Sequence, residues 1–221
     1  MKFVISREAL LRPLQLVAGV VEKRQTLPVL SNILLDVKGQ QLSLTGTDLE
    51  VELVGRVTLE EVTLEGEITV PGKKLMDIVR SLPDGSMIEF EQDEQRINIR
   101  SGRSRFTLSS LPATEFPNIE EIAGEQPFTV EQAKLRRVID RVAFAMAQQD
   151  VRYYLNGMLL EVNASSLRSV ATDGHRLATC IVEASGPETQ LQLIVPRKGI
   201  LELSKLLTEP EDSVTLLLSP N

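Results

Sequence analysis

Few residues in this chain could support catalysis or bind a metal ion. His175 is the only histidine and Cys180 the only cysteine, so neither a zinc site nor an internal disulfide is expected. His175 follows an Asp-Gly pair, which is typical of a tight turn between two strands. The sequence contains no glycine-rich phosphate-binding loop. It therefore predicts a protein that is not an enzyme and that uses no cofactor or metal.

Two aspartates leave one alternative open. Asp48 and Asp173 each follow a threonine, and they stand 125 positions apart (173 − 48 = 125). Paired carboxylates can hold a divalent metal, so a metal-dependent hydrolase using Asp48 or Asp173 is one interpretation. The simpler one is that each aspartate caps a turn of its own domain, because Asp side chains accept hydrogen bonds from nearby backbone amides.

The same spacing of 125 recurs along the chain. Residues 30–37, LSNILLDV, align with residues 155–162, LNGMLLEV, and VPGK at 70–73 aligns with VPRK at 195–198. Phe3 aligns with Phe128, and Leu14 with Ile139, at the same offset. Self-similarity at a fixed period is the signature of tandem domains. We expect one domain at residues 1–125 and a second at 126–221, joined by the acidic, proline-bracketed segment 117–127.

Hydrophobic periodicity predicts the elements that position these residues. Strands are expected at 2–5, 29–37, 41–46, 51–59, 67–70 and 87–91, and a hairpin at 96–108. Helices are expected at 6–19, with Ser6 as the N-cap, and at 71–82. The side chains expected to face the core are Leu10, Leu14, Val17, Leu75, Ile78 and Leu82. Two helices and about eight strands per repeat indicate an α+β fold with helices packed on antiparallel sheets.

The second repeat is expected to be incomplete. The chain stops at Asn221, before any counterpart of the hairpin at 96–108. We therefore expect a fragment of a longer protein, in which the last strand, near residues 214–218, is left at the edge of its sheet.

The net charge of −7 hides an uneven distribution. Residues 1–24, 72–82, 129–147 and 196–207, which contain the four helices, together carry +9, so the remainder carries −16. On the third helix, Lys134, Arg137 and Arg141 recur on a face separate from the apolar stripe. A basic helical surface on an acidic body predicts contact with nucleic-acid phosphates without sequence readout. A solvated face of mixed charge is the alternative.

One segment combines aromatic and basic side chains. Residues 148–155 contain Arg152 and both tyrosines of the chain, Tyr153 and Tyr154. Such residues can contact phosphates or stack on bases, or the tyrosines can cover the domain core. No apolar run is long enough to span a membrane, and charges appear too early for a signal peptide. We expect a soluble, cytoplasmic protein.

Four longer strings, at residues 42–50, 100–106, 149–159 and 171–178, resemble the bacterial sliding clamps, the β subunits of DNA polymerase III. The resemblance covers the whole chain. It implies a processivity factor, a ring of two subunits with three similar domains each, whose helices line a hole that encloses duplex DNA. It also implies binding of the replicative polymerase, the clamp loader and repair proteins through short linear motifs. A protein-interaction scaffold without DNA contact is a further alternative.

The resemblance also assigns roles to individual residues. The residues that it places toward DNA are Arg24, Lys73, Gln149, Tyr153, Tyr154, Arg197 and Lys198. Those that it places in a peptide-binding pocket are Leu155, Thr172, Gly174, His175, Arg176 and Leu177. Those that it places at the subunit interface are Phe106 and Leu108.

Overall fold

The structure is a computed structural model that describes residues 1–21, 27–117 and 126–219. The chain divides into two compact units, Met1–Ile119 (unit one) and Glu120–Asn221 (unit two). Each unit has a hydrophobic core of its own. No helix in the described part of the chain is long and apolar enough to cross a membrane.

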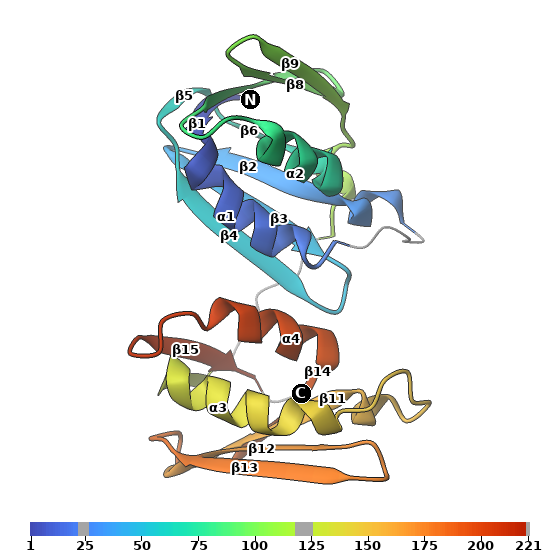
Figure 1. The fold of residues 1–221 in the computed structure, drawn as a ribbon, viewed down its shortest axis with the longest axis vertical. Helices are drawn as coiled ribbons and strands as arrows, with labels where there is room; N and C mark the ends of the chain where they lie inside the picture. The colour runs from blue at the N-terminus through green and yellow to red at the C-terminus, as the bar shows by residue number, and fades with distance from the viewer. Residues whose placement is uncertain (22–26, 118–125, 220–221) are drawn as a thin grey trace. The chain divides into compact units, whose positions relative to one another are not determined.

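Unit one packs two α-helices on antiparallel sheets (Figure 1). A four-stranded sheet has the order β4-β3-β2-β6, and a five-stranded sheet has the order β5-β1-β7-β8-β9. The elements are β1 (Lys2–Ser6), α1 (Arg7–Ala18), the 3-10 helix Pro28–Ser31, β2 (Asn32–Lys38), β3 (Gln41–Thr47), β4 (Glu52–Thr58), β5 (Glu61–Leu64), β6 (Gly66–Pro71), α2 (Gly72–Ser81), β7 (Met87–Asp93), β8 (Arg96–Ser101), β9 (Ser104–Ser109) and the 3-10 helix Ala113–Glu115.

Unit two repeats this plan with fewer strands among its described residues. A four-stranded sheet has the order β13-β12-β11-β14, and β10 pairs with β15 alone. The elements are β10 (Gln126–Glu131), α3 (Gln132–Val142), the 3-10 helices Ala143–Ala145 and Tyr153–Leu155, β11 (Gly157–Val162), β12 (Ser166–Thr172), β13 (Leu177–Glu183), β14 (Leu191–Pro196), α4 (Arg197–Leu206) and β15 (Ser213–Leu218).

The repeat extends to strand order and register. The strands β11, β12, β13 and β14 each begin 125 residues after β2, β3, β4 and β6 (157 − 32 = 125 for the first pair). The pair Leu34↔Thr69 in unit one has its counterpart in Leu159↔Ile194 in unit two. The α+β fold with helices on antiparallel sheets is therefore confirmed.

The first helix shows how the sequence determines this packing. The Ser6 hydroxyl accepts a hydrogen bond from the Ala9 amide at 3.4 Å and so caps α1. Leu10, Leu14 and Val17 are buried, as the periodicity predicts. The helix also contains Pro13, which lies against Gly55 of β4. The approach is close: a Cβ added at Gly55 would lie 2.9 Å from Pro13 Cβ.

Three details of the expected elements are wrong. The strand expected at 29–37 begins only at Asn32, because Pro28 starts a 3-10 helix. The strand β5 was not expected at all. The buried face of α2 also includes Met76 and Val79, which were not expected, and Ile78 packs only partly buried against the same core, since the buried positions 72, 75, 76 and 79 follow the 3.6-residue period.

The last strand lies at a sheet edge. β7 in unit one pairs with both β1 and β8, whereas β15 pairs only with β10, from Gln126↔Leu218 to Glu131↔Ser213. Within the described residues, the other edge of β15 has no strand beside it.

Candidate functional site

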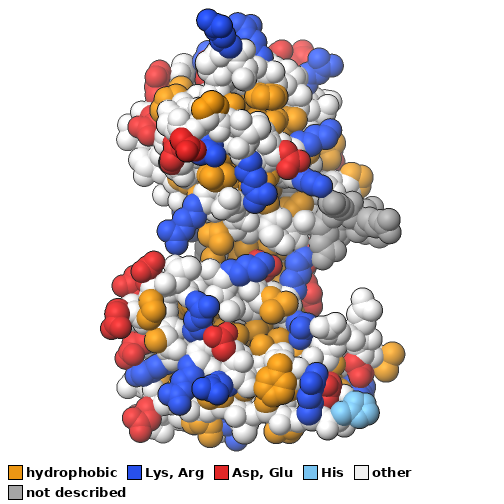
Figure 2. All heavy atoms as spheres, in the orientation of Figure 1, with side chains coloured by type: hydrophobic (Ala, Val, Ile, Leu, Met, Phe, Trp, Pro, Cys, Tyr) orange, Lys and Arg blue, Asp and Glu red, His pale blue; other side chains and the backbone are white. Residues whose placement is uncertain are grey.

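The helices of unit one carry exposed cations around a shallow hollow. Lys73, Lys74 and Arg80 project from α2, and they line a cavity of about 580 Å³ together with residues of α1 such as Gln15. None of these three cations forms an ion pair within residues 1–21, 27–117 and 126–219. They are therefore available to a bound anion, and Figure 2 shows Lys and Arg side chains spread over the helix-bearing face.

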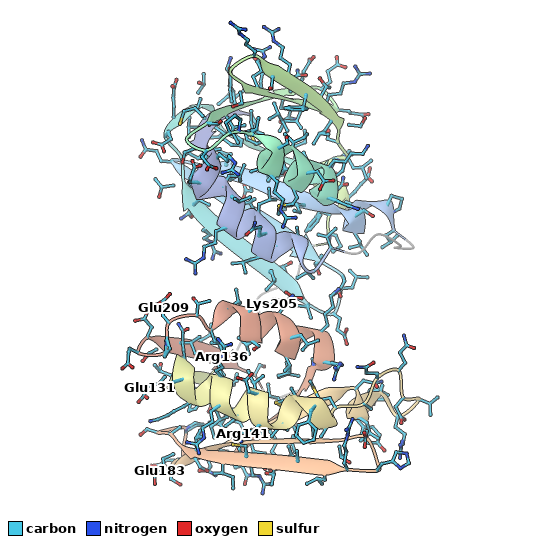
Figure 3. All side chains as sticks on the ribbon, viewed as in Figure 1. Glu131, Arg136, Arg141, Glu183, Lys205 and Glu209 are labelled. Carbon is cyan, nitrogen blue, oxygen red and sulfur yellow. The ribbon has the colours of Figure 1, made fainter. Side chains whose placement is uncertain are left out.

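The helices of unit two carry cations of two kinds. Lys134 pairs with Glu131 at 3.0 Å, and Lys205 with Glu202 at 2.7 Å. In contrast, Arg137 and Arg141 are exposed and form no ion pair with the described residues. Figure 3 shows Arg141 on α3 and Lys205 on α4. Of the three cations expected along α3, Lys134 is thus neutralised by an ion pair, whereas Arg137 and Arg141 have no ion pair with the described residues.

Arg136, in contrast, forms bonds within unit two. Its Nη1 donates to the carbonyl oxygen of Leu207 at 2.9 Å, and its Nε lies 3.5 Å from the Asp140 carboxylate. Leu207 follows α4 directly, so this arginine ties α3 to the end of α4. Arg136 is labelled on α3 in Figure 3.

Arg197 and Lys198 begin α4, and both are half-buried. The Arg197 guanidinium donates to the carbonyl oxygens of Ala143 and Met146, each at 3.4 Å. Arg197 therefore also fixes the chain that leaves α3. Arg24, the remaining cation assigned to DNA, lies outside the described residues.

The tyrosine segment is an exposed loop with a fixed base. Asp150 N donates to Asn156 Oδ1 and Asn156 Nδ2 donates to Asp150 O, both at 2.9 Å. Gln149 adopts a positive φ of 56°. Tyr153 is 83% exposed and Tyr154 50% exposed. The alternative that the tyrosines cover the domain core is therefore wrong for this structure.

Arg152 links this loop to the turn between β12 and β13. Its Nε and Nη2 donate to the Asp150 carboxylate at 3.0 and 2.9 Å, and these bonds lower the pKa of Asp150 from 3.8 to about 2. A Cβ added at Gly174 would lie 3.1 Å from Arg152 Nη2. Gly174 has a φ of +87°, a conformation that glycine adopts without strain. The Arg152 guanidinium also leaves little room for a side chain at this position.

The turn itself is held by Asp173 and Thr172. Asp173 Oδ1 accepts from the amides of His175 and Arg176 at 2.9 and 3.0 Å, and these backbone bonds lower the Asp173 pKa. Thr172 Oγ1 donates to the Arg176 carbonyl oxygen at 2.7 Å. Leu177, the first residue of β13, is 66% exposed.

A polar cavity of about 330 Å³ lies between this turn and the end of α3. Its lining includes His175, Arg176 and Asp150. The Arg176 guanidinium lies 5.6 Å from the ring centre of Phe144, in cation–π contact. The structure thus brings Thr172, Gly174, His175 and Arg176 together with the tyrosine loop. Sequence reasoning did not identify the contact between Arg152 and Gly174, since the two positions are remote in the chain and no local pattern marks it.

The two aspartates of the hydrolase alternative cap turns. Asp48 Oδ1 accepts from the amides of Glu50 and Val51 at 3.0 and 2.8 Å, as Asp173 does in unit two. Asp48 caps a turn in unit one and Asp173 caps a turn in unit two, as the simpler interpretation predicts. In the described part of the chain, no group of three His, Cys, Asp or Glu side chains could hold a metal ion.

The two residues assigned to a subunit interface are largely covered. Leu108 is 7% exposed and belongs to the core of unit one, and Phe106 packs partly against that core. Both lie on β9, the terminal strand of the five-stranded sheet. Among the described residues, no strand pairs with the outer edge of β9, and its outward side chains include Arg105 and Thr107.

Comparison with known proteins agrees with this arrangement. Residues 1–120 match the family described as DNA polymerase III beta subunit, N-terminal domain, and residues 129–221 match its central domain. The chain is 66% identical over 219 residues to the beta sliding clamp of Pseudomonas aeruginosa, covering 99% of this chain and 60% of that protein. It is 48% identical over 221 residues to the beta sliding clamp of Escherichia coli, again covering 60% of the relative.

Solved structures give the same result. A crystal structure of the DNA polymerase III subunit beta from Pseudomonas aeruginosa superposes with a TM-score of 0.95 at 65% identity, over 99% of this chain and 60% of that one. Pol III beta of Caulobacter crescentus gives a TM-score of 0.93 at 42% identity, over 100% of this chain and 60% of that one. The chain thus spans about 60% of the length of these relatives. With both units matched in sequence and in fold, the chain belongs to the family of the DNA polymerase III beta subunit.

Proposed function

We propose that this chain is part of a sliding clamp, a processivity factor that encircles duplex DNA and tethers the replicative polymerase to it. The protein acts by binding, without catalysis, and it works in the cytoplasm as a homodimeric ring. The boundary between the first and second clamp domains falls between residues 125 and 126. One observation carries the proposal: two units of the same fold, offset by 125 residues, each present a pair of helices with exposed cations.

In each unit, the helices make a DNA-facing surface. Lys73, Lys74 and Arg80 in unit one, and Arg137 and Arg141 in unit two, are exposed without ion pairs to described residues. Cations of this kind bind phosphate oxygens and leave the base edges unread, as a protein that moves along DNA requires. Tyr153, Tyr154 and Gln149 extend the surface with groups that can stack or form hydrogen bonds. Arg24, Arg197 and Lys198 complete the proposed set.

The turn after β12 makes one side of a peptide-binding pocket. Leu177 is exposed beside His175 and Arg176, and Leu155 is half-buried at the end of the tyrosine loop. Thr172 and Gly174 set the turn. An exposed and a half-buried leucine beside fixed polar groups suit a short peptide with apolar anchors. Its carriers are the polymerase, the clamp loader and other clamp-binding proteins. The edge of β9, with Phe106 and Leu108 behind it, is the proposed contact with the second subunit.

A chimaera tests the proposal. This chain is joined to the remaining part of the Pseudomonas aeruginosa relative, and we call the product the extended chain. It should form a dimer, load onto primed circular DNA and support processive synthesis. Replacing Lys73 and Lys74 with Glu should shorten the products, whereas Lys38→Glu, a reversal at the last residue of β2, should not. A folded dimer that fails to load, or equal effects of both reversals, would contradict the proposal.

A further inference from the structure

The hollow between α1 and α2 of unit one combines apolar and basic side chains. The two helices lie side by side (Figure 1), and the cavity between them measures about 580 Å³. This volume lies within the range of about 300–1,000 Å³ that is common for small-molecule sites. Its apolar lining includes Ala18 and Val21 at the end of α1 and Met76 of α2. We call it the α1–α2 hollow.

The charged residues of the α1–α2 hollow come from α2. Lys73, Lys74 and Arg80 line it, are exposed, and form no ion pair with any residue that the structure describes. Asp77 is the only carboxylate among the described lining residues, so the lining carries a net charge of +2 (3 − 1 = 2). Apolar groups beside unpaired cations suit a ligand that has both an apolar part and an anionic part.

Unit two fills the corresponding space with a side chain of its own. Gly72 of unit one is replaced by Arg197, 125 positions later (197 − 72 = 125). The Arg197 guanidinium donates to the carbonyl oxygens of Ala143 and Met146, each at 3.4 Å. These two residues are the counterparts of the two residues at the end of α1 that line the hollow. The hollow is therefore a property of unit one, where glycine leaves open the space that a guanidinium takes in unit two.

We propose that the α1–α2 hollow binds a nucleoside phosphate, with the base inside the hollow and the phosphate beside the cations of α2. The base buries apolar area against Met76, whose sulfur makes favourable contacts with aromatic rings, and the phosphate oxygens accept charge-assisted hydrogen bonds. The nucleotide is either free or part of an unpaired DNA strand, and only the second source rests on the proposed function. A duplex bound at Lys73 leaves the hollow empty, because its bases stay paired and stacked.

Methyl NMR of the 221-residue chain tests where the base lies. Thymidine monophosphate should shift the methyl resonances of Ala18, Val21 and Met76, whereas inorganic phosphate at the same concentration should leave them in place. Equal shifts with both probes would overturn the inference, because the anion alone would then account for binding. Unshifted methyl resonances at saturating thymidine monophosphate and at saturating oligothymidylate would overturn it as well.

A variant that fills the hollow distinguishes a pocket from a basic surface. Gly72→Arg together with Ile33→Met copies Arg197 and Met158 of unit two, and the second change relieves the 2.9 Å approach of an added Cβ to the Ile33 side chain. The double variant gains a cation, yet it should bind both thymidine probes about tenfold more weakly. Gln41→Arg gains the same charge at the first residue of β3 and should bind them as the unchanged chain does. Equal or tighter binding by the double variant would contradict a pocket.

Asp77→Asn tests the charge without repacking the hollow. Loss of the carboxylate should tighten the binding of thymidine monophosphate severalfold, whereas Asp93→Asn at the exposed end of β7 should not. An unchanged affinity in Asp77→Asn would contradict a phosphate beside α2.

The same titrations identify the source of the nucleotide. Oligothymidylate that binds at least tenfold more tightly than thymidine monophosphate assigns the hollow to an unpaired strand, and equal affinities assign it to free nucleotides. Dimer formation and DNA loading of the extended chain are measured separately, so a failure of the nucleotide site is distinct from a failure of the clamp function.

Discussion

Arg152 and Asp150 determine the conformation of the tyrosine loop at the scale of single residues. The carboxylate accepts two side-chain bonds from Arg152 and one from its backbone amide at 2.8 Å. The guanidinium in turn lies against Gly174. Together with the two hydrogen bonds between Asp150 and Asn156, this ion pair holds the exposed tyrosines near the β12–β13 turn.

The pKa of Asp150 is the most direct test of that pair. Arg152 lowers it from 3.8 to about 2. Because the folded-state pKa is depressed, the contribution of Asp150 to stability is present above about pH 4 and is lost as the pH falls toward about 2. We expect NMR titration of the Asp150 carboxyl to give a midpoint near 2, and Arg152→Met to raise it. An unchanged midpoint in Arg152→Met would contradict the assigned cause.

Gly174 gives a second prediction at this scale. Gly174→Ala combines a φ of +87° with a Cβ 3.1 Å from Arg152 Nη2. Gly85→Ala is its control, because Gly85 has a φ of +74° but no atom within 4 Å of the added Cβ. Backbone strain should cost each variant about 1 kcal/mol of unfolding free energy. Only Gly174→Ala should also raise the Asp150 pKa, by displacing Arg152. Denaturant unfolding and the same NMR titration measure both effects.

At the scale of elements, the two units differ at their last common strand. β7 lies between β1 and β8, whereas β15 has only β10 beside it among the described residues. A strand paired on one side satisfies alternate amides and exposes the others to solvent.

Hydrogen exchange should therefore alternate along β15. In the 221-residue chain, amides of β15 that face β10 should be protected and those on the other edge should exchange quickly. Along β7, amides facing either neighbour should be protected. Uniform protection along β15 would show that another chain or segment pairs with its free edge.

At the scale of the whole molecule, charge is divided by element type. The chain carries −7 overall, while the four helical regions carry +9. Some of those cations form ion pairs with carboxylates of the same unit, as Lys134, Arg136 and Lys205 do. Others, such as Lys73 and Arg137, have no ion pair with described residues. The acidic remainder opposes nonspecific adhesion to nucleic acid away from the helices.

DNA binding by the extended chain should therefore be insensitive to sequence and sensitive to salt. The affinity for two circular duplex DNAs of different sequence should be equal. It should fall steeply as the salt concentration rises, because each phosphate contact releases bound counterions. Removing the charges of Lys73 and Lys74 should reduce the salt dependence, whereas Lys38→Gln should leave it unchanged. A strong preference for one sequence at constant salt would contradict binding through phosphates.

The sequence by itself determined the repeat, the helices and most strands. These features are local: Ser6 caps α1, the apolar periods mark the buried faces, and Asp48 and Asp173 cap turns within three residues of themselves. Each depends on neighbours in the chain, so its pattern can be recognised without coordinates.

Only the tertiary structure decided which distant groups meet. The contact of Arg152 with Gly174, the link from Arg136 to Leu207 and the bridge between Thr69 and Leu111 all join remote segments. The sequence contains these residues but not their distances, because an ion pair or a backbone bridge forms only after two elements have packed. For the same reason, the repeat predicted two equivalent sheets, whereas the coordinates were needed to show that a cluster around Phe116 covers the outer face of the sheet in unit one.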